Sequence, residues 1–217
     1  MCRIPGIVLA SRSPRRRSLL EAAGVPFELH PVSTEEVECP GRPGRTASVN
    51  SEAKAAEAGR RFPGRVILAA DTVVFLGRVL GKPAGLDEAR KMLEHLSGRT
   101  HTVHTAVTVS GPSRPRPVTR IAVTRVEMKD YGPETVEEYI RRADPLDKAG
   151  AYGIQEHGEL LVSRVEGSLT NVIGLPLETV AEIFELFPET GIYSGRLRDQ
   201  AGLAAAAWPP SGIISSG

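Results

Sequence analysis

The sequence is poor in the features that mark several classes of protein. It holds two cysteines, Cys2 and Cys39, among 217 residues, too few for a disulfide framework or a cysteine zinc site. The formal net charge is +1, so the chain lacks the strong positive field of a nucleic-acid-binding module. No apolar run is long enough to cross a bilayer, and the first residues do not resemble a signal peptide. We therefore expect a protein of the reducing cytoplasm that binds neither membranes nor nucleic acid.

Common nucleotide-binding and hydrolase motifs are also missing. The sequence contains no P-loop, no dinucleotide-binding fingerprint and no G-x-S-x-G segment around a nucleophilic serine. His101 and His104 lie three residues apart in an expected strand, where they would face opposite sides of a sheet. A histidine metal site is therefore not predicted.

Strand-like and helix-like segments alternate along the chain, which favours an α/β fold with a mixed, twisted sheet and flanking helices. Strands are expected near residues 8–10, 27–32, 66–76, 103–109, 118–128 and 160–165, and helices near 14–23, 47–60, 87–96, 133–143 and 177–187. Loops are expected at 40–45 and 167–176, and Val49, Ala53 and Ala56 should form the apolar side of the second helix.

The chain shows no clear linker, so one domain over residues 1–188, with two lobes, is the expected organisation. From residue 189 onward the composition turns to glycine, alanine, serine and proline. We expect residues 189–217 to be a flexible C-terminal extension without a catalytic role.

Residues 8–20 combine a short strand, a turn and the start of a helix. Ser13 suits the N-cap of this helix, and Pro14 suits its first position. Arginines at positions 15–17 follow, although the amide end of a helix already carries partial positive charge. Free amides and guanidinium groups suit phosphate oxygens, so the turn predicts an anion site. The alternative is a strand–helix junction with solvated arginines, and helical spacing prevents all three from facing one ligand.

Asp71 interrupts the most apolar segment of the chain, residues 66–76, and Thr72 adds a second polar group there. A buried carboxylate must be paired, hydrogen-bonded or bound to a metal. The alternative is that the strand ends at Asp71 and the carboxylate caps a turn. Glu35 or Glu36 could supply a second carboxylate for Mg²⁺ or Mn²⁺, although an acidic pair in a loop is usually solvated. With Lys54 and Lys82, these groups predict a metal–polyphosphate site.

Several separated segments match the motifs of one known family in the same order. They are residues 11–16, Glu36, Lys54, residues 70–72, 82–83, 96–99, 147–155 and 171–176. Over about residues 4–187 the chain resembles the Maf family of nucleoside triphosphate pyrophosphatases. The resemblance implies two lobes around a deep cleft, similar to the inosine triphosphate pyrophosphatases. It also implies hydrolysis of a nucleoside triphosphate to monophosphate and pyrophosphate, dependence on Mg²⁺ or Mn²⁺, and a homodimer.

The resemblance implies roles for the basic residues. Ser11, Arg15 and Arg16 would bind phosphate groups, whereas Lys54 and Lys82 would compensate the charge that develops during the reaction.

The remaining candidates would carry the acid–base chemistry and the recognition of the nucleoside. The resemblance makes Asp71 the proton acceptor that activates water, and both Glu36 and Asp71 would contact the metal. Thr72, Tyr152 and Gln155 would bind substrate, with Gln155 near the base.

Residues 150–155 resemble the branch of the family that acts on dTTP and UTP. Glu156 departs from the family, which usually has glycine or alanine there, and this acid could alter base preference or point into solvent. Two alternatives stay open. One is a pyrophosphatase with another base preference, such as 7-methyl-GTP. The other is a nucleotide-binding regulator of cell division or septum formation in which hydrolysis is incidental.

Overall fold

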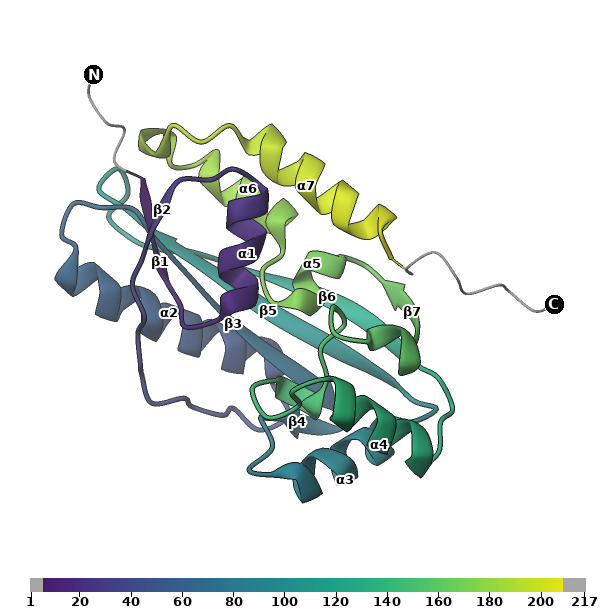
Figure 1. Cartoon of the computed structure of the whole chain (residues 1–217). Helices are drawn as coiled ribbons and strands as arrows, with labels where there is room; N and C mark the ends of the chain where they lie inside the picture. The colour runs from purple at the N-terminus through teal and green to yellow at the C-terminus, as the bar shows by residue number, and fades with distance from the viewer. Residues whose placement is uncertain (1–5, 209–217) are drawn as a thin grey trace.

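A seven-stranded mixed sheet forms the centre of the computed structural model, which describes residues 6–208 (Figure 1). Its strands are β1 (Ile7–Ala10), β2 (Phe27–Leu29), β3 (Ile67–Leu76), β4 (Arg78–Leu80), β5 (Thr100–Ser110), β6 (Val118–Met128) and β7 (Val162–Glu166). The order is β2-β1-β3-β5-β6-β7, with β4 paired to β3. β1 runs parallel to β2 and β3, and the other neighbours are antiparallel. The predicted mixed α/β fold class is confirmed.

Helices cover both faces of this sheet. They are α1 (Pro14–Ala22), α2 (Pro43–Arg61), α3 (Leu86–Leu96), α4 (Pro133–Arg142), α5 (Leu169–Ile173), α6 (Leu177–Phe184) and α7 (Ser194–Ala206), with 3₁₀ turns η1 (Ala149–Ala151), η2 (Gly158–Leu160) and η3 (Pro188–Thr190). α2 lies on one face, α1, α5, α6 and α7 lie on the other, and α3 and α4 pack at one end (Figure 1). No helix in residues 6–208 has the length and apolar character needed to span a bilayer.

Alternating side chains of β1 and β3 enter two different cores. Val8 and Ile67 pack with Ala55 of α2, whereas Leu9 and Leu68 belong to the larger cluster on the opposite face. A strand that is apolar on both sides is typical of a central strand covered by helices on both faces.

β3 continues past the end of β1. The parallel pairing with β1 covers Ile67 to Ala69, whereas the pairing with β5 continues to Phe75. Residues 70–73 therefore pair with β5 alone, because β4 pairs only from Val74 onward. This unpaired edge of β3 carries Asp71 and Thr72.

Two segments predicted as loops are partly helical. α2 begins at Pro43, inside the expected loop 40–45, with the proline in its first turn. α5 lies inside the expected loop 167–176, where the Ser168 side chain caps its start and Gly174 ends it with a φ of 119°. Proline, serine and glycine favour helix ends as well as loops, so composition alone did not separate the two.

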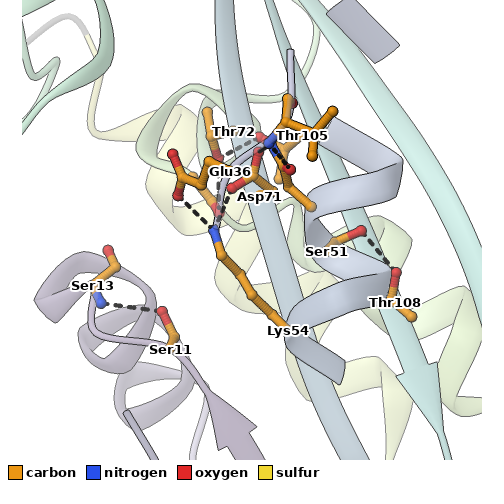
Figure 2. A network of polar contacts seen from close by, with 12 residues as sticks. Ser11, Ser13, Glu36, Ser51, Lys54, Asp71, Thr72, Thr105 and Thr108 are labelled. Carbon is orange, nitrogen blue, oxygen red and sulfur yellow. Dashed lines mark hydrogen bonds and ion pairs between the residues drawn. The ribbon is translucent and has the colours of Figure 1, made fainter. Parts of the chain in front are cut away.

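The predicted apolar side of α2 is wrong. Ala56 is exposed, and the face against the sheet contains Ser51, Ala55 and Ala58. Ser51 Oγ lies 2.8 Å from Thr108 Oγ1 of β5, so the hydroxyl is satisfied inside the interface (Figure 2). Small polar side chains therefore replace part of the expected apolar stripe.

The C-terminal segment also differs from the expectation of a flexible extension. Residues 194–206 form α7, in which Leu197 and Ala201 are buried and join the main core. The helix packs on α6 and α5. Residues 209–217 lie outside the described part of the chain, and the domain boundary at residue 188 stays a prediction.

Candidate functional site

A cavity of about 610 Å³ opens beside the unpaired edge of β3, within the usual size range of small-molecule sites. Its walls include the start of α1, the segment before α2, the β4–α3 connection and the loop around η1. The residues predicted for the site all line it: Ser11, Arg15, Arg16, Glu36, Lys54, Asp71, Thr72, Lys82, Tyr152 and Gln155. Glu35, the other candidate carboxylate, is exposed and is not among the residues that line the cavity.

Asp71 and Lys54 form the centre of one wall. The Asp71 side chain is almost fully buried, and Lys54 Nζ lies 2.5 Å from its Oδ1. The same ammonium group lies 3.0 Å from Glu36 Oε1, so one cation bridges two carboxylates from different segments (Figure 2). Because Asp71 lies within β3, the alternative of a turn-capping carboxylate is wrong.

The charge of Glu36 is stabilised by its surroundings. Partial burial favours protonation of its carboxyl group, but the positive charges of Lys54, Lys82 and Arg16 outweigh this effect and hold its pKa below the ordinary value. Glu36 is therefore ionised at neutral pH, as a ligand for a cation must be.

The start of α1 has the predicted cap. Ser13 is the N-cap, Pro14 lies in the first turn, and the Ser13 hydroxyl accepts a hydrogen bond from the Arg16 backbone N–H at 3.4 Å. Ser11 Oγ in turn accepts from the Ser13 N–H at 3.1 Å (Figure 2). These bonds fix the turn that joins β1 to the arginine-bearing helix.

The three arginines of this turn have different partners. Arg16 is bonded through Nε to Gly174 O at 2.7 Å and through Nη2 to Thr72 Oγ1 at 3.0 Å. Arg15 Nη1 lies 2.8 Å from Asp147 Oδ2. Arg17 forms a solvent-exposed ion pair within α1 and does not line the cavity. The predicted divergence of the three side chains is confirmed.

Arg16 is half-buried in the cavity wall. Burial lowers the pKa of its guanidinium group, and the negative charge of Asp71 opposes that effect. A guanidinium group keeps its proton in proteins, so the cavity retains a positive charge at this position.

Residues 152–155 form another part of the cavity wall. Tyr152 is buried, and its hydroxyl oxygen lies 2.8 Å from His101 Nε2 on β5. Burial raises the pKa of the Tyr152 hydroxyl, which therefore stays neutral. Gln155 is exposed where the loop meets solvent. Within this loop only the Gln155 amide combines exposure with a place in the cavity wall and hydrogen-bonding capacity toward a base.

Asp147 and Lys148 precede this loop, and the sequence alone assigned no role to them. Lys148 is almost fully buried, and its ammonium group lies 2.6 Å from Asp147 Oδ1 and 2.8 Å from Glu156 Oε2. Glu156 therefore contacts Lys148 instead of pointing freely into solvent. Partial burial raises the pKa of Asp147, but Lys148 and Arg15 more than offset it and hold the pKa below its usual value. The position of Lys148 in a glycine-rich segment with few apolar residues was the sequence feature that could have identified it as part of the site.

Asn50 is another contact that sequence reasoning missed. Its Nδ2 donates to Asp71 Oδ2 at 3.4 Å and to the Val37 carbonyl at 3.2 Å. Asn50 lies one helical turn before Lys54, and this spacing places the two side chains on one face of α2. Asn50 could have been identified from the sequence by its helical spacing from Lys54.

The geometry is complemented by comparisons with known proteins. A family model described as Maf-like protein matches residues 6–187. A dTTP/UTP pyrophosphatase of Anaeromyxobacter sp. (strain Fw109-5) is 46% identical over 181 residues, which are 82% of this chain and 87% of that protein. One of Moorella thermoacetica is 45% identical over 186 residues, 83% of this chain and 94% of that protein.

A third relative, the dTTP/UTP pyrophosphatase of Akkermansia muciniphila, is 43% identical over 179 residues, 82% of this chain and 94% of that protein. Among solved structures, the Staphylococcus aureus Ham1 protein aligns with a TM-score of 0.43 and 15% identity, over 58% of this chain and 74% of that one. That structural likeness is too low to carry an argument. The match to the family model and the sequence identities show that the chain belongs to the Maf family.

Proposed function

We propose that the chain hydrolyses dTTP and UTP to nucleoside monophosphate and pyrophosphate. The proposal is supported by relatives of that name at 43% to 46% identity. The observation that carries it is the convergence of a buried carboxylate, Asp71, and a half-buried cation, Arg16, on one cavity of about 610 Å³. Such a cavity offers a proton acceptor and phosphate-binding groups to the same ligand.

In the proposed reaction a water oxygen attacks the α-phosphorus, and the bond from that phosphorus to the bridging oxygen of pyrophosphate breaks. Asp71 accepts the proton of the water molecule. Lys54, 2.5 Å from Asp71 Oδ1, holds the carboxylate in place and compensates negative charge. Alignment of water, carboxylate and phosphate in one site supplies most of the catalysis in phosphoryl chemistry.

Glu36 and Asp71 also fit a divalent cation. Both carboxylates approach the Lys54 ammonium group, so this position already accommodates a positive charge between two oxygen ligands. Residues 6–208 contain no group of three or more His, Cys, Asp or Glu side chains that could hold a metal ion, so Glu36 and Asp71 are considered as a pair of ligands. Mg²⁺ commonly uses one or two carboxylates and completes its shell with phosphate oxygens and water. When bound, Mg²⁺ or Mn²⁺ would offset the charge of the triphosphate and of the leaving pyrophosphate.

The phosphate groups would be bound at the start of α1. Ser11, Arg15 and Arg16 line this side of the cavity, and Lys82 lines it from the β4–α3 connection. The amide end of α1 adds partial positive charge. These groups favour the more highly charged pyrophosphate as it forms.

Thr72, Tyr152 and Gln155 would complete the substrate site, with Gln155 near the base. We also propose that the protein is a homodimer, which light scattering of the purified chain would test. A monomer at micromolar concentration would contradict this part of the proposal.

The test is to incubate the purified chain with a panel of nucleoside triphosphates and either Mg²⁺ or Mn²⁺, and to separate the products. We expect dTMP or UMP together with pyrophosphate, and faster turnover of dTTP and UTP than of purine triphosphates or 7-methyl-GTP. Release of orthophosphate and a nucleoside diphosphate, or no turnover of any triphosphate, would refute the proposal.

The matching variant is Asp71→Asn, which keeps the size of the side chain but removes the proton acceptor. We expect turnover to fall by about 100-fold or more, while dTTP binding, measured by calorimetry, persists. Unchanged turnover would remove Asp71 from the mechanism.

A further inference from the structure

Thr105 on β5 contacts the substrate site without belonging to its wall. Its side chain is completely buried, and it does not line the cavity. Its hydroxyl lies 3.0 Å from Thr72 Oγ1 on the neighbouring strand, at directly paired positions of β3 and β5 (Figure 2). Thr105 can therefore act on a ligand only indirectly, and Thr72 is its neighbour in the cavity wall.

The hydrogen bonds around Thr105 connect it to Thr72 and to α5. Each of the two hydroxyls has a carbonyl acceptor in reach: Asn171 O lies 3.2 Å from Thr105 Oγ1, and Gly174 O lies 3.4 Å from Thr72 Oγ1. Either threonine can therefore be the donor in the bond between the two hydroxyls. A hydroxyl oxygen has two acceptor lone pairs, so in both cases Thr72 Oγ1 also accepts the N–H of Arg16 at 3.0 Å.

These contacts close a ring through α5. Asn171 supplies a carbonyl group that also accepts the backbone N–H of Gly174 at 3.0 Å, and Gly174, which ends the helix, supplies a second carbonyl group. Asn171 O accepts from Thr105, and Gly174 O accepts from Arg16 Nε at 2.7 Å. The guanidinium group is thus held by Gly174 O and Thr72 Oγ1, two contacts that lead back to α5, and by Ser11 Oγ, which accepts from Nη1 at 3.5 Å. Its terminal nitrogens keep further N–H groups that suit phosphate oxygens.

We propose that Thr105 is a positioning residue for nucleotide binding, because it orients Thr72 and through it the guanidinium group of Arg16. The inference rests on the proposed function, in which Arg16 binds a phosphate group. The hydroxyl of Thr105 is the necessary part, and its methyl group only fills space.

The test compares Thr105→Val with Thr108→Val, a control on the same strand. Thr108 is also completely buried, and its hydroxyl lies 2.8 Å from Ser51 Oγ and 3.0 Å from Thr119 Oγ1, outside the cavity wall. Both variants remove one completely buried hydroxyl that has two hydrogen-bond partners. Two quantities are measured for each: KM and kcat for dTTP, and the Kd for inorganic tripolyphosphate by calorimetry.

We expect Thr105→Val to raise KM and the tripolyphosphate Kd about 10-fold, the scale of one net hydrogen bond. Its kcat should fall less than KM rises. Thr108→Val should lower the melting temperature to a similar extent and leave KM and Kd unchanged. Thr105→Ser keeps the hydroxyl and should restore both constants.

Equal KM and Kd values in the two valine variants would overturn the proposal, as would a Thr105→Ser protein that binds no better than Thr105→Val. If Thr105→Val does not fold, Thr105→Ala removes the same hydroxyl and replaces it in the comparison. A wild-type chain that binds tripolyphosphate but turns over no triphosphate would refute the proposed function, and the tripolyphosphate comparison would still decide the role of Thr105. A wild-type chain that does not bind tripolyphosphate would overturn both.

Discussion

His101 is a buried histidine whose protonation should destabilise the protein. The side chain is 2% exposed, and its Nε2 is bonded to the Tyr152 hydroxyl. Among the described residues no group accepts or donates a hydrogen bond at Nδ1. A charged imidazole would therefore carry an N–H without an acceptor in a low-dielectric environment. Burial lowers the pKa of His101 from 6.5 to about 4.

The sign of the effect on stability follows from proton binding in the two states. The unfolded chain binds a proton near pH 6.5, whereas the folded chain binds it only near pH 4. This contribution to stability is therefore complete well above pH 6.5 and is lost as the pH falls from 6.5 toward 4. Integration of these two titrations gives a loss of about 2 kcal/mol between pH 7 and pH 5.

The assay is urea unfolding at pH 7 and pH 5 of the wild type, His101→Gln and His104→Gln. Glutamine cannot titrate, so the wild type should lose about 2 kcal/mol more than His101→Gln over this interval. His104 is the control, because burial also lowers its pKa but the side chain is only half-buried. The His104→Gln substitution should change the pH dependence of the free energy of unfolding less than His101→Gln does. Equal losses in the wild type and His101→Gln would refute the reasoning.

Three further substitutions test separate parts of the structure. Lys148→Met leaves the partly exposed carboxylates of Asp147 and Glu156 without their shared cation and should lower the free energy of unfolding by about 1 kcal/mol; urea unfolding identical to the wild type would contradict a stabilising role of these ion pairs. Leu197→Ala opens a space between α7 and the core and should cost about 3 kcal/mol in the same assay. If that variant is as stable as the wild type, α7 does not belong to the folded unit. Arg17→Ala removes only an exposed ion pair, so unfolding should change by less than about 1 kcal/mol and kcat/KM for dTTP should stay the same.

The parts of the fold that were predictable have local causes. The Ser13 cap and Pro14 fix the start of α1 through chemistry contained in adjacent residues. β3 was predictable because ten neighbouring residues are almost all apolar, and Asp71 was conspicuous for the same reason. The site residues could be chosen from sequence because each is chemically unusual in its own segment.

The parts that were missed depend on distant segments. α5 has five residues, too few to be stable alone, and carbonyl groups at Asn171 and at its C-cap Gly174 are held by Thr105 and Arg16. α7 is rich in alanine and glycine, and its buried side becomes apparent only when α6 is in place. The role of Thr105 depends on the register between β3 and β5, which no local pattern specifies.

The floor of the cavity consists of continuous strands, and this limits how the protein can respond to a ligand. β3 and β5 run from the side that carries α1 to the end that carries α3 and α4 (Figure 1). They are paired without a break from Ile67 opposite Ser110 to Phe75 opposite Thr102. The side that carries α1 and the end that carries α3 and α4 are thus joined by a pair of hydrogen-bonded strands instead of a hinge loop. Moving these two parts toward each other requires the paired strands to twist. The width of the cavity is therefore largely set before a ligand enters, and the conformational entropy lost on binding falls mainly on side chains at its rim, such as Lys82 and Gln155.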